Sequence, residues 1–227
     1  MMSTELQTLH AEITACRACP RLVAWREKMG KEKRAAFRDH EYWAKPVPGF
    51  GDVNAKLIIF GLAPGAHGSN RTGRMFTGDG SGDFLYPALH RAGLASQPRA
   101  TGRDDGMKLT GLYITAAVRC APPDNKPLPE ELNRCADWTR REFALLPRAK
   151  VILALGKIAH GALLKHYGLK QSLHPFAHAA EYLLPDGKIL LDSYHVSRQN
   201  TQTGKLTAEM FDAVLARALE LAAIHDS

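Results

Sequence analysis

Four cysteines are the residues whose type and spacing point most directly to chemistry. Cys16 and Cys19 form a C-x2-C pair, whereas Cys120 and Cys135 have fourteen residues between them and must meet that pair by folding. Four thiolates suit zinc or an iron–sulfur cluster. A zinc ribbon usually carries two close pairs and only one is present, so the spacing favours a cluster over zinc and a metal site over free thiols.

A glycine-rich segment over residues 61–82 is the second candidate for chemistry. It holds seven glycines in 22 residues, which lets the backbone approach a ligand closely and turn its N–H groups toward it. The segment lacks the Gly-Lys-Ser/Thr of a Walker loop, and no G-x-G-x-x-G directly follows the apolar run before it. It therefore predicts a ligand-binding loop that is neither a Walker loop nor a dinucleotide site.

The strands and helices that the apolar pattern predicts must position these residues. Buried strands are predicted over residues 56–61, 112–118, 151–155 and 188–192, and helices over residues 4–15, 83–92, 128–146, 156–167 and 206–224. The alternation predicts an α/β fold, a three-layer α/β/α domain over residues 1–227 with a short, mostly parallel sheet of about four strands. Ligands bind such sheets at the carboxyl ends of the strands. The distinctive loops follow strands there, over residues 61–82, 119–129 and 195–204.

The balance of charge favours a polyanionic partner. The net charge is +7, from 30 basic and 23 acidic residues. Residues 21–45 are basic with interleaved aromatic side chains, and are either a DNA-facing edge or a solvated charged face. No apolar run is long enough to cross a bilayer, and the N-terminus lacks the apolar core of a signal peptide. We therefore expect a cytoplasmic protein, associated with the nucleoid through DNA, and a monomer because no apolar helical stripe is left over.

Two motifs carry a resemblance to a known family. Residues 61–79 read G-L-A-P-G-A-H-G-S-N-R-T-G-R-M-F-T-G-D, and residues 195–200 read H-V-S-R-Q-N. They resemble the first and third motifs of the uracil-DNA glycosylase superfamily, in particular of its family-five (type b) branch. Residues 42–52 and 115–123 resemble the family as well, so the match runs from Cys16 to about Asn200. The resemblance implies an enzyme that flips uracil or another deaminated base out of DNA and hydrolyses its N-glycosidic bond, leaving an abasic site.

The resemblance assigns catalysis to Asp79 and His195. A carboxylate beneath the sugar can stabilise the positive charge that develops there, and a histidine N–H can stabilise the oxygen of the leaving base. Phe76 would stack on the flipped base. Outside the motifs, a turn aspartate, a structural histidine and a core phenylalanine would be the ordinary interpretations. The other contacts to the base that the resemblance implies come from Gly61, Leu62, Ala63, Gly65, His67, Ala116 and Asn200.

The resemblance also implies contacts to the duplex and a cofactor. Arg198 and Gln199 lie where the family pushes a loop into the gap left by the flipped nucleotide, with Ser197 beside them. Arg71 and Arg74 are the candidates for phosphate contacts. The four cysteines would hold a [4Fe–4S] cluster with a structural role, tying the N-terminal helix to the segment after the second strand.

Two positions depart from the branches of the family that are strict for uracil. Those branches carry a polar or charged residue where this chain has Leu62, and a base-reading asparagine where it has Ala116. Without a polar reader, a wrong base leaves no buried group unpaired, so we expect a broader base range that includes hypoxanthine.

Three other classes of protein compete with the glycosylase interpretation. The main alternative is a metal-clamped module that binds DNA or a nucleotide without cutting it, which the presence of Asp79 and His195 at motif positions disfavours. A redox enzyme would need a second cofactor site, and four cysteines leave no open position on zinc for a hydrolase. No lysine occupies a recognisable Schiff-base position, so we expect a monofunctional glycosylase.

Overall fold

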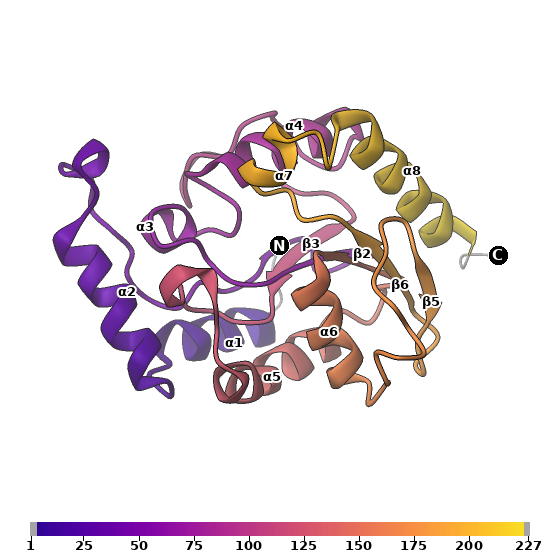
Figure 1. Cartoon of the computed structure of the whole chain (residues 1–227), viewed down its shortest axis with the longest axis horizontal. Coiled ribbons are helices and arrows are strands. Elements are labelled where there is room, and N and C mark those ends of the chain that lie inside the picture. The colour runs from indigo at the N-terminus through magenta and orange to yellow at the C-terminus, as the bar shows by residue number, and fades with distance from the viewer. Residues whose placement is uncertain (1–3, 225–227) are drawn as a thin grey trace.

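A central sheet flanked by helices forms the computed structural model, which describes residues 4–224 (Figure 1). The strands are β1 (Phe50–Gly51), β2 (Leu57–Gly61), β3 (Leu112–Ala116), β4 (Val151–Leu155), β5 (Glu181–Leu183) and β6 (Ile189–Ser193). The helices are α1 (Thr4–Ala15), α2 (Pro20–Glu32), α3 (Ser69–Thr72), α4 (Gly80–Arg91), α5 (Pro129–Ala144), α6 (Lys157–His166), α7 (Arg198–Gln202) and α8 (Ala208–Ile224). Two short 3-10 helices are η1 (Ala35–Phe37) and η2 (Pro123–Asn125).

The sheet of residues 4–224 has six strands in the order β1-β3-β2-β4-β6-β5. The four inner strands run parallel, and β1 and β5 pair antiparallel at the two edges. The predicted parallel strands are confirmed, but the predicted number of about four is too low. The two edge strands are two and three residues long, too short to show a period in the sequence.

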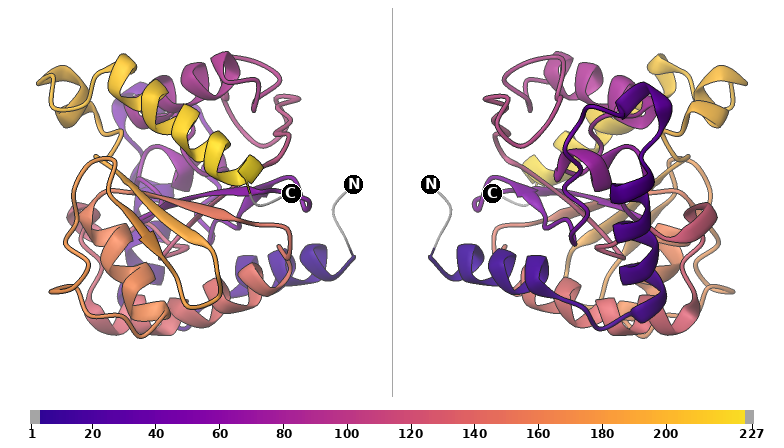
Figure 2. Two further views of the ribbon diagram at one scale, coloured as in Figure 1. Left: turned by 90° about the vertical axis from the view of Figure 1, so that its right-hand side faces the viewer. Right: turned by 90° about the vertical axis from the view of Figure 1, so that its left-hand side faces the viewer.

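Both faces of the inner strands are apolar because successive side chains point to opposite sides. Leu57 and Ile59 pack on the side covered by α4 and α8, whereas Ile58 and Phe60 pack on the side covered by α1, α5 and α6. Figures 1 and 2 show these two helical layers above and below the sheet. The chain is therefore a three-layer α/β/α structure, as predicted.

Two short helices lie where the sequence predicted only loops. The four-residue helix α3 interrupts the glycine-rich segment, and the five-residue helix α7 follows β6. The predicted helix over residues 83–92 in fact begins at Gly80, because Asp79 caps it by accepting hydrogen bonds from the backbone N–H groups of Ser81 and Gly82. The helix boundary thus lies within the segment that carries the candidate chemistry.

The N-terminal helices wrap one end of the molecule. Helix α1 packs under the sheet, and α2 stands beside α3 at the left of Figure 1. Leu22 of α2 joins Cys19, Cys120 and Cys135 in a small separate core. The N-terminal segment therefore meets both the glycine-rich segment and the chain after β3.

Candidate functional site

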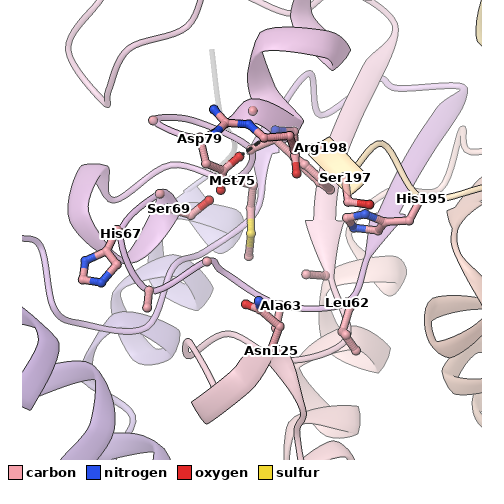
Figure 3. Close-up of a pocket in the computed structure, with 18 of the residues that line it drawn as sticks. Leu62, Ala63, His67, Ser69, Met75, Asp79, Asn125, His195, Ser197 and Arg198 are labelled. Carbon is pink, nitrogen blue, oxygen red and sulfur yellow. Dashed lines mark hydrogen bonds between the residues drawn. The ribbon is translucent and has the colours of Figure 1, made fainter. Parts of the chain in front are cut away.

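A cavity of about 920 Å³ lies at the carboxyl ends of the parallel strands. Its walls come from the segments after β2, β3, β4 and β6, at the edge of the sheet where α/β folds bind ligands. Figure 3 shows Asp79 and Arg198 at one end of it, His195 and His67 on opposite sides, and Leu62, Ala63 and Asn125 along the bottom. Sequence-predicted residues that line it are Leu62, Ala63, Gly65, His67, Arg71, Phe76, Asp79, Ala116, His195, Ser197 and Arg198.

Phe76 is seated at the end of β2 by an unusual backbone conformation. Its φ is 54°, in the left-handed region that bulky residues avoid. The ring lies against Gly61, where an added Cβ would come 2.7 Å from Phe76 Cζ. Phe76 and His195 have ring centroids 6.4 Å apart. Backbone strain at a ligand cavity, together with a glycine that makes room for the ring, indicates a ring placed for binding.

Asp79 presents a carboxylate to the cavity while it caps α4. Oδ1 accepts the N–H of Ser81 at 3.0 Å and of Gly82 at 3.4 Å, and Oδ2 packs against Gly65 and Gly68. Burial raises the pKa of Asp79, and the backbone donors partly offset that rise. Gly65 and Gly68 leave no space for a Cβ, which explains two of the glycines in this segment.

His195 enters the cavity as a neutral imidazole. Burial lowers the pKa of His195, so the ring is uncharged at neutral pH. Within residues 4–224 its ring nitrogens make no hydrogen bond, so a ring N–H is available to a ligand. Its Cβ packs 3.1 Å from the position that a Cβ on Gly156 would take, and its carbonyl accepts a hydrogen bond from Asn200 Nδ2 at 2.8 Å.

His67 and Arg71 line the cavity but already have partners. His67 Nδ1 is 3.0 Å from the hydroxyl of Tyr42, and burial together with Arg34 and Arg71 lowers the pKa of His67. Arg71 donates to the carbonyls of His67 at 2.8 Å and Gly78 at 3.0 Å, with its guanidinium 3.9 Å from the ring centroid of Phe37. Arg71 therefore shapes the glycine-rich segment.

Arg74, the second predicted phosphate contact, lies inside the protein rather than on its surface. Arg74 is 5% exposed, pairs with Asp105, donates to the carbonyl of Arg103 and lies over the ring of Phe50. With its guanidinium buried and paired in this way, Arg74 is not placed to contact a phosphate. Its role is to fasten the glycine-rich segment to the loop before β3.

Asn200, predicted to contact the base, is turned toward its own loop. Its side chain donates to the carbonyl of His195 and does not line the cavity, so it holds the histidine loop in place. In the same loop, Ser197 caps α7 and lines the cavity, whereas Gln199 is exposed outside it. Arg198 is exposed and lines the cavity, in a position to reach DNA.

Several lining residues were not predicted. Asn125 lies at the bottom of the cavity in η2, where Asp124 and Asn125 have left-handed φ values of 53° and 55°. Aspartate and asparagine tolerate that conformation better than most residues, so the Pro-Pro-Asp-Asn turn was the available signal. Trp25 of α2 also lines the cavity, and its buried Nε1 has no hydrogen-bond partner in the described chain.

All four cysteines line one small cavity between α2, the segment after β3 and α5. Arg26 reaches into it, and its Nη1 donates to Cys120 Sγ at 2.8 Å while its buried Nε has no partner among the described residues. Burial raises the pKa of Cys120 to about 12 and that of Cys135 to about 11. In residues 4–224 no three or more His, Cys, Asp or Glu side chains are arranged as a metal site. The four thiols are thus gathered around one cavity.

Known proteins are similar to this chain over most of its length. The family model described as "Uracil DNA glycosylase superfamily" matches residues 48–219. The Type-5 uracil-DNA glycosylase of Thermus thermophilus is 64% identical over 212 residues, covering 93% of this chain and 96% of the relative. That of Mycobacterium bovis is 49% identical, covering 96% and 82%. That of Pyrobaculum aerophilum is 45% identical, covering 89% and 87%.

Proposed function

Because this chain belongs to the uracil-DNA glycosylase superfamily and hydrolyses the N-glycosidic bond of uracil in DNA, we propose that the reaction takes place in the cavity at the carboxyl ends of β2, β3, β4 and β6. Asp79 and His195 form the catalytic pair. The product is an abasic site, and the enzyme serves the repair of deaminated bases.

The observation that carries this assignment is the convergence of unlike groups on one cavity. Asp79 comes from the segment after β2 and His195 from the segment after β6, and Phe76 lies beside the histidine ring. A flipped base stacked on Phe76 would place its sugar toward the carboxylate and its carbonyl oxygen toward the imidazole N–H. The carboxylate stabilises the cationic sugar and orients water, and the N–H stabilises the departing base.

The test is a glycosylase assay on a duplex oligonucleotide with one uracil, followed by alkali to break abasic sites. We expect Asp79→Asn and His195→Ala each to slow cleavage by about 10²-fold or more. His90→Ala, at an exposed position on α4, is the matched control and should cleave like wild type. Cleavage at the wild-type rate by either site variant would remove that residue from the mechanism. Wild-type protein that binds the duplex without cleaving it would instead support the alternative of a non-catalytic DNA-binding module.

The base range is broader than uracil alone and includes hypoxanthine. Leu62 and Ala116 line the cavity with apolar groups, so the base meets few polar readers there. Discrimination by hydrogen bonds depends on leaving a buried group unpaired when the wrong base enters. Uracil removed at rates far above every other deaminated base would contradict the broad range.

The cysteine cavity holds a [4Fe–4S] cluster on Cys16, Cys19, Cys120 and Cys135. Support comes from the four thiols around one cavity and from the buried Arg26, whose unpartnered Nε and short contact to Cys120 suit an anionic thiolate centre. Such a cluster would supply cross-links between α2, the segment after β3 and α5, and take no part in hydrolysis.

Iron and acid-labile sulfide are measured in protein purified without oxygen. We expect four of each per chain, and a lower melting temperature together with loss of iron in Cys135→Ser. Zinc in place of iron, or four Cys→Ser variants that all stay folded and active, would contradict a structural cluster.

The protein acts as a monomer in the cytoplasm, associated with the nucleoid through DNA. Its net charge of +7 supports attraction to DNA, and in the described part of the chain no helix is long and apolar enough to cross a membrane. Light scattering behind size-exclusion chromatography should give the mass of one chain, and a dimer mass would contradict this.

A further inference from the structure

The backbone that aims His195 is held by hydrogen bonds on every side. Figure 3 shows His195 reaching into the cavity from the segment that follows β6. Gly156 donates its N–H to the carbonyl of Ser193 at 2.8 Å, and Asn200 donates to the carbonyl of His195. A third contact comes from the N–H of Tyr194, which donates to Nδ1 of His178 at 3.2 Å.

This contact defines the protonation state of His178. Because Nδ1 accepts the Tyr194 N–H, it carries no proton, and the ring is the neutral Nε2–H form. The carbonyl of Met210 accepts a hydrogen bond from the same ring. The ring also stacks on Tyr194, with centroids 4.9 Å apart and planes 20° apart. Burial lowers the pKa of His178, which keeps it neutral at physiological pH.

His178 lies on a strap, residues 170–180, that runs between α6 and β5. A second histidine anchors the strap in the opposite protonation state. His160 Nδ1 faces the carboxylate of Asp192 at 2.9 Å, and Nε2 faces the carbonyl of His174 at 2.9 Å. A carbonyl and an ionised carboxylate only accept, so with Asp192 ionised both nitrogens carry protons and His160 is an imidazolium. Burial alone would lower the pKa of His160, but Asp192 and His174 raise it overall.

Asp192 connects this anchor to the site. It lies on β6, three residues before His195, and its carboxylate faces His160. The main chains join there too, since Ala179 donates to the carbonyl of Asp192 at 2.8 Å. The strap is therefore fixed at both His174 and Ala179, with His178 held between them against Tyr194.

We propose that His178 is a positioning residue for the glycosylase reaction, which accepts the Tyr194 N–H and thereby fixes the peptide that aims His195 at the leaving base. The inference rests on the proposed role of His195. It adds that only the neutral ring performs this task. A proton on Nδ1 would face the Tyr194 N–H with a second donor and break the contact one residue from His195.

The pKa of His178 is lowered by burial and raised by the Met210 backbone, and no neighbouring charge is among the causes. The charged groups around it are Lys205, whose Nζ lies 5.0 Å from the Tyr194 ring centroid, and the His160–Asp192 pair on the strap anchor. The Asp192 carboxylate is paired with His160. Protonation of His178 is therefore expected below the ordinary range of histidine.

The test compares two variants with wild type in single-turnover cleavage of uracil duplex across pH. His178→Phe keeps a ring to stack on Tyr194 but has no acceptor, whereas His178→Asn can place an amide oxygen near the position of Nδ1. At neutral pH we expect His178→Phe to lose about tenfold in rate at saturating enzyme, with unchanged DNA affinity. His178→Asn should recover most of that loss.

The pH dependence separates positioning from packing. As pH falls through the pKa of His178, wild type loses the contact, so the rate ratio of wild type to His178→Phe should fall from about tenfold toward one. A ratio that stays constant across pH, equal rates at neutral pH, or a melting temperature and DNA affinity lowered equally in both variants would overturn the proposal. Wild-type cleavage in the same assay is the reference, so absence of any cleavage would instead contradict the glycosylase function.

Discussion

Asp79 combines a structural and a chemical task in one side chain. It caps α4 through two backbone N–H groups, and it is the carboxylate of the site. Its pKa is raised by burial, so the folded protein binds the proton more tightly than the unfolded chain does. The contribution of Asp79 to the free energy of unfolding therefore falls as pH rises from the unfolded pKa to the folded pKa. At neutral pH its ionised carboxylate destabilises the fold.

Two substitutions at Asp79 should separate the tasks. Asn keeps a capping oxygen and removes the buried charge, so we expect Asp79→Asn to be at least as stable as wild type at neutral pH. Ala removes the cap, and Asp79→Ala should unfold about 1 kcal/mol more easily than Asp79→Asn. Both should be catalytically impaired. Urea unfolding at pH 7 measures the difference, and equal stability of the two variants would show that the cap contributes nothing.

Ala116 offers a residue-scale test of the broad base range. It lies at the end of β3 and lines the cavity beside Leu62, where an amide could reach the edge of the base. Ala116→Asn should raise the preference for uracil over hypoxanthine by about tenfold or more, because a mismatched edge would leave the new amide unpaired. Cleavage rates on matched duplexes with each base give the ratio. An unchanged ratio would mean that Ala116 does not face the base edge.

At the scale of elements, a buried charge network joins β3 to α5. Glu142 Oε2 accepts hydrogen bonds from Arg119 at 2.7 Å and Thr115 at 2.6 Å, and Tyr113 donates to Oε1 at 2.8 Å. Glu142 and Arg119 are almost fully buried. Burial would raise the pKa of Glu142, but Arg119 and the three hydrogen bonds lower it overall. Arg119 precedes Cys120, so this network supports the cysteine cavity.

Removing the charge of Glu142 should therefore be severe. Glu142→Gln leaves Arg119 as an uncompensated buried cation and should cost about 3–5 kcal/mol of unfolding free energy. Asp137→Asn is the control on the same helix, because the Asp137–Arg140 pair is exposed and should matter by less than about 1 kcal/mol. The pKa of Glu142 is lower in the folded protein than in the unfolded chain, so its ionised carboxylate stabilises the fold at pH values above the unfolded pKa. The difference in unfolding free energy between wild type and Glu142→Gln should therefore shrink as pH falls through the folded pKa. Denaturant titrations at several pH values measure both effects.

The elements predicted correctly from the sequence are those whose apolar pattern repeats over many residues. Helix α1 and strand β4 have the predicted bounds, because their burial patterns repeat over the whole element. Strands β1 and β5 and helices α3 and α7 were missed, since elements of two to five residues owe their conformation to their neighbours. The site shows the same limit. Asp79 and His195 lie in the cavity, whereas the burial of Arg74 could not be predicted because Asp105, its partner in space, lies thirty-one residues away in sequence.

At the scale of the whole molecule, DNA binding should depend on which cations remain free. The net charge of +7 implies attraction to the duplex and release of counterions on binding. Several arginines are nevertheless committed within the protein, as Arg74 is to Asp105 and Arg119 is to Glu142. Arg198 is exposed at the rim of the cavity and makes no ion pair within residues 4–224. Salt dependence can therefore distinguish arginines that sequence alone treats as equivalent.

Arg198→Gln should change the salt dependence of DNA binding, whereas Arg74→Gln should change the stability of the fold. On uracil-free duplex, the slope of log affinity against log salt should become shallower by about 0.9 in Arg198→Gln, the value for one lost phosphate contact, with stability unchanged. Arg74→Gln should keep the wild-type slope but lose about 1–3 kcal/mol of stability, because the Asp105 carboxylate loses its charged partner and keeps only backbone N–H donors. Fluorescence anisotropy over a range of salt concentrations measures the slope, and denaturant unfolding measures the stability.

A shallower slope in a folded Arg74→Gln variant would show that this arginine leaves its pair to bind DNA. An unchanged slope in Arg198→Gln would mean that Arg198 acts on the duplex without neutralising a phosphate.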